Sequence, residues 1–381
     1  MVYSQFCYLF MKHTRLILTW FCLLISTGYM MGRDSLMFHD ISHHMTVELI
    51  PSYNIPTHGY YRGFNDHDEA VPAAGAMHLK YGFSLNPESR PGALYPTAYQ
   101  GIGLGVQSFF HHKMTGTPIL LYIYQGSRIA DLGTDISVGY EWNLGASYGW
   151  KTNQVVSSLW NIYINVCIPF TCQISPSCRL SLGPEFTHYS NGDTSFPNGG
   201  ANTVGCRIGF TYATNENADT RSPGRALFQT DKMSFRNHME YDLAIYGGFR
   251  AKRQMNDSWV ELINKPFATA GLTFNPHYRF NRYFSAGPSL DILYDSSTSE
   301  TGFLKQSGCG LSAKGELSMP FFAVNIGAGY GISDSYQLRG FYTTYGLKFF
   351  MNDKLFVTIN YRLSSRQYCH NLMFGMGIRL K

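Results

Sequence analysis

Apolar and polar residues alternate one by one through most of this chain, and this period of two constrains its fold more than any other feature. Residues 136–144, 322–330, 355–363 and 372–380 each place apolar side chains at every second position. Side chains of a β-strand point alternately to opposite faces, whereas those of a helix repeat every 3.6 residues. The pattern therefore predicts half-buried strands and argues against a helical fold.

About sixteen segments carry this alternation, and most are close to the ~9–11 residues with which a tilted strand crosses a bilayer. Gly, Asn, Asp, Ser and Pro are frequent between them, as expected for turns. The predicted strands cover residues 43–52, 74–85, 97–110, 117–127, 134–145, 158–171, 178–190, 201–213, 237–250, 265–279, 283–294, 307–318, 320–331, 337–349, 354–364 and 369–380. An even number of strands is typical of bacterial barrels.

The composition favours a membrane barrel over a soluble domain. Charged residues make up 14% of the chain, against roughly 25% in typical soluble domains, and there are 38 Gly, 27 Tyr and 27 Phe. We therefore predict an all-β fold, an antiparallel transmembrane β-barrel of about 14 to 16 strands, with two eight-stranded β units as the alternative. A single barrel is preferred because it closes all strand edges in one sheet.

The N-terminus resembles a secretory signal. Lys12 and Arg15 precede an apolar run at residues 16–25, which small residues follow, and no apolar run of 18 residues occurs after residue 30. Residues 1–30 are therefore predicted to be a signal peptide, with Met11 as a possible true start. The chain is expected to be exported to the outer membrane of a Gram-negative bacterium.

A polar linker at residues 215–236 divides the predicted strands into two groups, residues 42–214 and residues 237–381. The sequence Leu-Gly-Pro at 182–184 has a faint echo in Ala-Gly-Pro at 286–288. Duplication and coincidence explain this echo equally well.

A histidine and a serine extend the apolar face of one predicted strand. Even positions from 180 to 186 are apolar, and His188 and Ser190 continue the same face. A hydroxyl within reach of a general base meets the minimum requirement for an activated nucleophile. Asn202 begins the apolar face of the next strand, so a hairpin near residue 196 would bring it close to opposite Ser190. Asn202 is thus a candidate to orient the histidine, on a rim that faces lipid.

The run Phe-x-His188-x-Ser190-Asn191-Gly, followed by Pro197-Asn198-x-Gly, resembles the motif of PagL-type lipid A 3-O-deacylases, which are outer-membrane barrels. The likeness extends loosely over residues 42–214, and larger relatives described as acyloxyacyl hydrolases are similar to the full length. The resemblance implies Ser190 as nucleophile, His188 as general base and Asn191 as support for the oxyanion. Where the family has a glutamate that orients the histidine, this chain has Asn202.

The resemblance implies an esterase that removes an acyl chain from lipid A without a metal or an organic cofactor. Its expected partners are lipopolysaccharide and the outer membrane, and a homodimer is left open. The net charge of +5 is too small to indicate nucleic-acid binding. The alternative function is a non-catalytic barrel, a pore or a structural protein, that retains the motif. Cys172 and Cys178 flank a predicted turn, where a disulfide is one possibility.

Overall fold

The computed structural model describes residues 41–85, 92, 95–213, 238–256, 259–298, 302–333, 338–365 and 370–381. The predicted signal peptide and the predicted linker at 215–236 lie outside these residues. Within the described part of the chain, no helix is long and apolar enough to cross a membrane.

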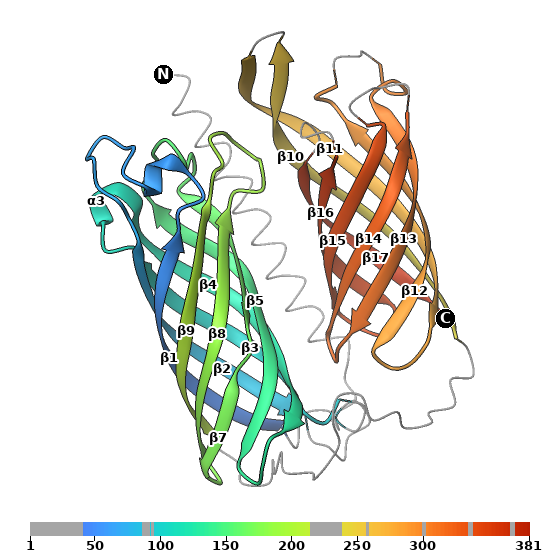
Figure 1. The fold of residues 1–381 in the computed structure, drawn as a ribbon. Coiled ribbons are helices and arrows are strands. Elements are labelled where there is room, and N and C mark those ends of the chain that lie inside the picture. Colours follow the sequence, from blue (N-terminus) through green and yellow to red (C-terminus); the bar gives the residue numbers. More distant parts are fainter. Residues whose placement is uncertain are drawn as a thin grey trace. The chain divides into compact units, whose positions relative to one another are not determined.

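Residues 41–213 form the first barrel, a ring of antiparallel strands (Figure 1). Apart from β6 and β7, each strand pairs with its sequence neighbours, and the last strand returns to the first, with Val47 opposite Phe210. The strands are β1 (Ile41–Ile55), β2 (Ala73–Leu85), β3 (Ala98–Ser108), β4 (Gly116–Asp131), β5 (Ile136–Trp150), β6 (Trp160–Cys167), β7 (Phe170–Ser175), β8 (Cys178–Ser190) and β9 (Ala201–Ala213). Two short helices, η1 (Gly59–Tyr61) and α3 (His112–Thr115), lie in the connections.

Strands β6 and β7 together occupy one place in this ring. Both pair with β5 on one side and with β8 on the other. The predicted strand at 158–171 is thus broken at Ile168 and Pro169, where proline lacks the N–H that a central strand donates to its neighbour. The first barrel is therefore eight-stranded in cross-section.

Residues 239–380 form the second barrel, which is closed and also has eight strands. Its last strand pairs with its first, with Ile245 opposite Met376. The strands are β10 (Met239–Asn256), β11 (Trp259–Arg279), β12 (Phe284–Asp295), β13 (Ser307–Ser318), β14 (Phe322–Ile332), β15 (Gly340–Phe350), β16 (Leu355–Ser364) and β17 (Asn371–Leu380).

The preferred expectation of one large barrel is therefore wrong, and the alternative of two eight-stranded units is what the chain forms. Strand alternation does not distinguish one barrel from two, because every strand has one inner and one outer face in either architecture. The residues that point inward distinguish one large barrel from two small ones, since the interior of an eight-stranded barrel is just wide enough to be filled by side chains. Each half of this chain supplies its own matched set of large polar residues for that purpose.

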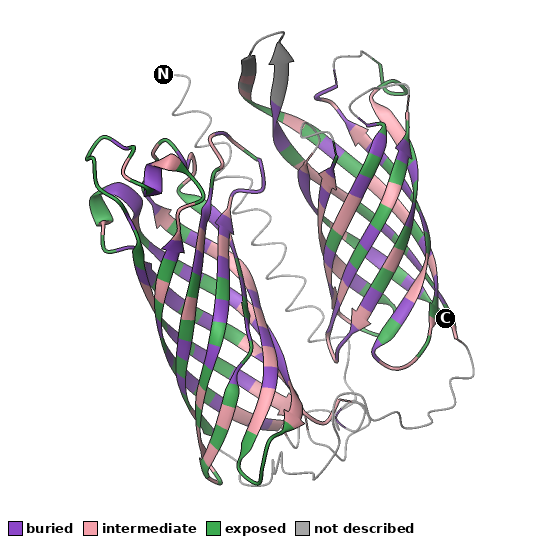
Figure 2. Ribbon diagram, in the orientation of Figure 1, coloured by how far each residue is buried: buried purple, intermediate pink, exposed green. Residues whose placement is uncertain are grey.

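Buried and exposed residues alternate along the strands of both barrels (Figure 2). The exposed side chains are largely apolar and many buried ones are polar, which is the pattern of transmembrane β-barrels. Along β1, for example, Val47 and Leu49 are exposed whereas Thr46 and Glu48 are buried. Along β13, Leu311 is exposed and Ser312 is buried. The period of two seen in the sequence thus corresponds to an outward apolar face.

Ion pairs fill the interior of the first barrel. Lys80 Nζ lies 2.9 Å from Glu48 Oε1 and 2.5 Å from Glu141 Oε1. Arg207 Nε donates to Glu185 Oε2 at 2.9 Å, and Arg207 also pairs with Glu141. Because each buried charge faces an opposite one, the interior meets the condition under which buried charges are tolerated.

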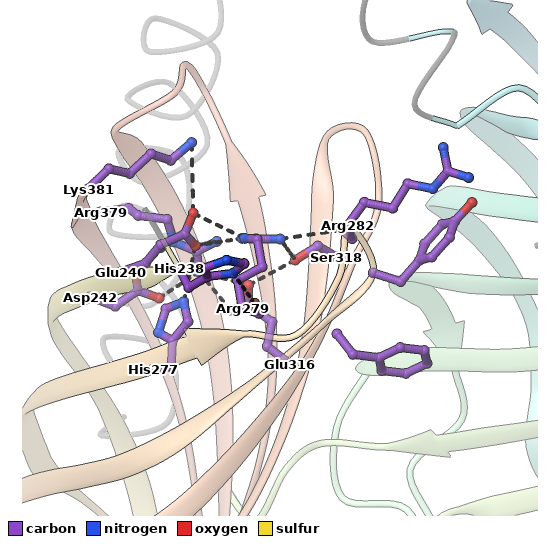
Figure 3. A network of polar contacts seen from close by, with 12 residues as sticks. His238, Glu240, Asp242, His277, Arg279, Arg282, Glu316, Ser318, Arg379 and Lys381 are labelled. Carbon is purple, nitrogen blue, oxygen red and sulfur yellow. Dashed lines mark hydrogen bonds and ion pairs between the residues drawn. The ribbon is translucent and has the colours of Figure 1, made fainter. Parts of the chain in front are cut away.

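The second barrel contains a network of the same kind (Figure 3). Arg379 donates to Asp242 from Nε and Nη2 at 2.7 Å each, and Nη2 reaches Glu316 at 2.8 Å. Glu240 accepts from Arg279 Nε at 3.1 Å and lies 3.2 Å from His277 Nε2. Neither described interior therefore resembles an open aqueous channel.

The two rims of each barrel differ in their connections. In each barrel, the first strand begins and the last strand ends at the same rim, which we call the terminal rim. The opposite rim, called the loop rim, carries the connections 56–72, 109–115, 151–159 and 191–200 in the first barrel and 296–306 and 333–339 in the second. The terminal rim has the short turns at 176–177, 280–283 and 351–354 and one longer connection, 86–97, in the first barrel.

The described cysteines, Cys167, Cys172, Cys178, Cys206 and Cys309, are all free thiols. Cys172 pairs with Leu180 across the β7–β8 hairpin, whereas Cys178 lies opposite Ser175. The two cysteines flanking the turn are therefore not opposite each other, and they form no disulfide.

Candidate functional site

His188 and Ser190 lie at the loop-rim end of β8, on its outward face. Leu180, Leu182 and Phe186 precede them on this face and are 46%, 54% and 41% exposed, which identifies it as the lipid-facing side. Tyr189, between the two, and Thr187, just before His188, point inward and are buried. The expectation from strand parity, that the pair continues the apolar face, agrees with this arrangement.

Asn202 lies directly opposite His188 in the β8–β9 ladder, rather than opposite Ser190 as the sequence suggested. The turn is centred about one residue earlier than expected, and this shift changes which residue faces the asparagine. His188 Nδ1 and Asn202 Oδ1 are 2.7 Å apart, within hydrogen-bonding distance. The amide is therefore better placed to orient the imidazole than the predicted hairpin implied.

This contact fixes the tautomer of the imidazole. A carboxamide oxygen only accepts hydrogen bonds, so Nδ1 of His188 must carry the proton that it donates to Asn202. In the neutral imidazole the other ring nitrogen, Nε2, then carries the lone pair. That is the protonation state in which a histidine acts as a general base.

Ser190 follows His188 by two positions on the same strand, roughly 6.6 Å along it from a rise of about 3.3 Å per residue. Among the described residues, no hydrogen bond joins Ser190 to His188. Ile162 and Ile164 of β6 lie opposite Ser190 and His188, so the pair is flanked by apolar side chains. Catalytic hydrogen bonds often shorten only once substrate is bound.

The connection from residue 191 to residue 200 is held by the side chains of two asparagines. Asn191 Nδ2 donates to Ser157 Oγ at 3.0 Å and to the Ser195 carbonyl at 2.8 Å. The backbone N–H of Asn191 donates to Asn198 Oδ1 at 3.0 Å. Support of an oxyanion by Asn191 stays a prediction, because it requires one of these donors to be released when substrate binds.

Asn198 explains the Pro-Asn-x-Gly part of the motif. Besides accepting from Asn191, it donates through Nδ2 to Asp193 Oδ1 at 2.9 Å. The carbonyl of Pro197 accepts from the N–H of Ser157, which ties this connection to the neighbouring one at 151–159. The sequence motif marked Asn198 and Pro197, but gave no sign that Ser157 completes the arrangement, because Ser157 lies more than thirty residues away.

Gly200 is the residue through which the chain enters β9. Its φ is +62°, and a Cβ atom would lie 2.3 Å from the Tyr189 carbonyl oxygen, so a side chain here would be strained and crowded. The Gly200 carbonyl accepts from Tyr61 Oη at 2.8 Å. Burial raises the pKa of Tyr61, which keeps the phenol protonated as a donor.

A cluster of buried aromatic and aliphatic residues backs the site from inside the barrel. Tyr189 packs against Trp150 and Phe109, with ring centroids 5.0 and 6.4 Å apart. The cluster contains Tyr60, Tyr61, Val71, Ala74, Phe109, Met114, Leu120, Tyr122, Tyr124, Trp150, Val155, Val156, Tyr163, Tyr189 and Ala201. Two of its members, Tyr189 and Ala201, pair across β8 and β9 beside the pair His188–Asn202. The cluster therefore holds the backbone that presents the outward polar groups.

Two carboxylates near the site in sequence are used elsewhere. Glu185 points into the barrel and pairs with Arg207, while Asp193 accepts from Asn198. Asn202 is thus the group that contacts the histidine. No cluster of three or more metal-ligating side chains is found in the part of the chain that the structure describes.

A comparison with known families finds a match in the second barrel. Residues 239–381 match the family model described as "Acyloxyacyl hydrolase, C-terminal domain". The second barrel resembles this acyloxyacyl hydrolase domain. The match confirms the resemblance to the PagL-type family, although it covers β10 to β17, whereas the His188-x-Ser190-Asn191 motif lies in the first barrel. No curated protein matches the sequence.

Solved structures that align with the chain include CdiB from Acinetobacter baumannii, at 11% identity and a TM-score of 0.19, with 89% of this chain and 60% of that chain covered. The CymD monoaromatic hydrocarbon channel aligns at 10% identity and 0.18, covering 92% and 91%. The Pseudomonas putida toluene transporter TodX aligns at 8% identity and 0.18, covering 90% and 88%. Scores this low support no argument about fold or function, so the fold rests on the strand registers.

Proposed function

We propose that this protein is an outer-membrane esterase that hydrolyses an ester-linked acyl chain of lipid A. The observation that carries the proposal is the 2.7 Å contact of His188 with Asn202 on the lipid-facing side of the loop rim. It prepares a base beside a serine at a surface that an acyl chain reaches from within the membrane. The family match of the second barrel supports the reaction class.

In the proposed reaction, Ser190 Oγ attacks the ester carbonyl while His188 Nε2 takes the hydroxyl proton. The leaving alkoxide of the sugar takes that proton as the tetrahedral intermediate collapses to an acyl-enzyme. Water then attacks the acyl-enzyme and gives a proton to His188, and the proton returns to Ser190 as the fatty acid leaves. Asn202 holds the imidazole in the required tautomer throughout.

The rim on which the site lies supports lipid A as the substrate. Bacterial outer-membrane barrels have short turns on the periplasmic side and longer loops outside the cell. The site is on the loop rim, beside the connection 191–200, and so it would face the outer leaflet. Ile162, Ile164 and Val204 flank it with apolar surface along which an acyl chain can lie.

The filled interiors argue against a pore as the alternative function. Side chains such as Lys80, Arg207 and Glu141 meet inside the first barrel, and Asp242, Glu316 and Arg379 meet inside the second. A sixteen-stranded barrel leaves an aqueous channel, whereas eight strands enclose a space that side chains fill. A purely structural barrel is therefore the remaining competitor, and it predicts no change in lipid A.

Mass spectrometry of lipid A from a Gram-negative host is the direct test. Cells that express the wild-type protein should lose the mass of one acyl chain from lipid A, and cells that express Ser190→Ala should not. Ser181→Ala is the matched control, because Ser181 is on the inward side of the same strand, and it should retain activity. Identical lipid A from the vector control and from cells with folded wild-type protein would overturn the proposal.

A further inference from the structure

A crevice of about 490 Å³ lies on the outer surface of the second barrel at its loop rim. Its floor is a row of outward residues at one level of three neighbouring strands, because Ile292 pairs with Cys309 and Cys309 pairs with Ile332. Ile292 and Ile332 are 41% and 61% exposed. Leu304 lines the crevice from the β12–β13 connection, and Arg339 lines it from the β14–β15 connection.

The strand that carries Ile292 shares a Gly-Pro pair with the strand that carries the candidate active site, although β12 is the third strand of its barrel and β8 the next-to-last strand of the other. His188 follows the Gly-Pro pair of β8 by four residues, and Ile292 follows the Gly-Pro pair of β12 by the same number. The residue paired with His188 is Asn202, and the residue paired with Ile292 is Cys309. The same spacing from a Gly-Pro pair therefore carries different side chains at the loop-rim ends of β8 and β12.

Ser307 and Ser333 also line the crevice, but its lining includes no histidine among the described residues. At the spacing of Ser190 from its Gly-Pro pair, β12 has Tyr294, whose hydroxyl donates to Gln306 at 3.1 Å while its ring stacks on Phe303 at 5.4 Å. At the spacing of His188, β12 has Ile292. The crevice thus has an apolar floor and, among the residues that line it, no histidine to act as a base, which suits binding rather than catalysis.

Arg339 gives the crevice its charge. It is exposed at the loop rim, and a guanidinium group matches two oxygens of a phosphate at once. An apolar row that continues into the lipid-facing surface, with a cation where the membrane meets water, fits an amphiphile with an anionic head. The volume is also within the range of ordinary small-molecule sites, roughly 300–1,000 Å³.

We propose that this crevice binds an anionic, phosphate-bearing lipid, with an acyl chain along Ile292, Cys309 and Ile332 and the phosphate at Arg339. The site is separate from the proposed esterase and does not depend on it. Its function is retention of a lipid by the second barrel, with no covalent step.

Native mass spectrometry of the full chain, in detergent with added lipid, tests the proposal. The probes are phosphatidylglycerol and phosphatidylcholine with the same acyl chains, and all variants carry Ser190→Ala so that hydrolysis cannot remove bound lipid. The parent should retain phosphatidylglycerol preferentially. Arg339→Gln should reduce this preference roughly tenfold, the scale of one charge-assisted hydrogen bond. Lys354→Gln, which removes an exposed cation at the terminal rim of the same barrel, should leave it unchanged.

A second variant tests the apolar part of the site. The larger side chain introduced by Cys309→Trp would point outward and fill the floor of the crevice. The variant should therefore weaken retention of phosphatidylglycerol although Arg339 is intact. Equal effects of Arg339→Gln and Lys354→Gln would overturn the proposal in favour of diffuse attraction to charge. Full displacement of the lipid by inorganic phosphate would reduce the crevice to an anion site and would also overturn it.

Discussion

The two barrels are both eight-stranded in cross-section and fill their interiors in the same way, but they differ at the loop rim. The first barrel places His188 opposite Asn202 over a packed aromatic cluster. The loop-rim end of β12 in the second barrel has Ile292 opposite Cys309, over a smaller buried cluster of Leu293, Leu338 and Met373 among the described residues.

This difference indicates that different physical requirements limit the inward and the outward side chains of such a barrel. Inside, carboxylates and cations must pair in both barrels, because an unpaired charge in a closed barrel is costly. Outside, near the rim, a position can carry a base, an amide or an apolar residue without changing the ladder. Chemistry can therefore be present in one barrel and missing in the other on nearly the same scaffold.

The largest expected effect comes from removing the proposed nucleophile. Ser190→Ala should lower the rate of lipid A deacylation by about 10⁴-fold or more, as losses of catalytic serines in hydrolases do. Release of fatty acid by the purified protein in detergent measures this rate. Tyr294→Ala, at the corresponding place in the second barrel, should leave the rate unchanged. A similar loss in both variants would mean that the two rims act as one site.

The interiors are compared by removing one cation from each. Arg207→Met leaves Glu185 without its partner and should destabilise the first barrel by about 3–5 kcal/mol, the cost of breaking a buried pair. Arg379→Met should do the same to the second barrel through Asp242 and Glu316.

Tryptophan fluorescence during urea unfolding separates these two effects. Trp142, Trp150 and Trp160 all belong to the first barrel, so most of the signal reports on it. Arg207→Met should shift the fluorescence transition to lower urea, whereas Arg379→Met should shift it little. Equal shifts would show that the barrels unfold as one cooperative unit.

The sequence predicted the strands and their faces well, because a period of two records directly which side of a strand meets lipid. It placed His188 and Ser190 outward and Glu185 inward, as the structure has them. It did not determine how many strands close one ring, because closure depends on long-range pairs such as Val47 with Phe210. The choice between one barrel and two therefore required the registers.

The site was predicted less completely than the faces. Strand parity brought Asn202 to the right surface, but the opposite residue depended on a turn whose centre the sequence gave only to within a residue. The use of Asn191 inside the loop depends on Ser157, which belongs to another connection. Contacts between distant connections leave no periodic trace in the sequence.

Asn202 of the first barrel, like Cys309 of the second, has an uncharged side chain. It therefore cannot stabilise an imidazolium by charge. Asn202→Glu should raise the deacylation rate by up to about 10²-fold, because a carboxylate stabilises the imidazolium that an amide only orients. Asn202→Ala should lower it about tenfold, since the imidazole loses its hydrogen bond. Both changes should appear in kcat rather than in KM. An unchanged rate in both variants would show that His188 is not the base.

The smallest expected effect concerns the loop that carries Asn191. Asn198→Ala removes the acceptor for the Asn191 N–H and the donor to Asp193, and loss of such bonds costs about 1–2 kcal/mol. We expect a rate reduced roughly tenfold and faster amide exchange at Asn191. Asn352→Ala, which removes comparable bonds to Lys354 and Leu355 in a turn of the second barrel, should not affect the rate. If Asn198→Ala instead raises the rate, the loop bonds of Asn191 restrain the enzyme, and their release supplies the oxyanion donor.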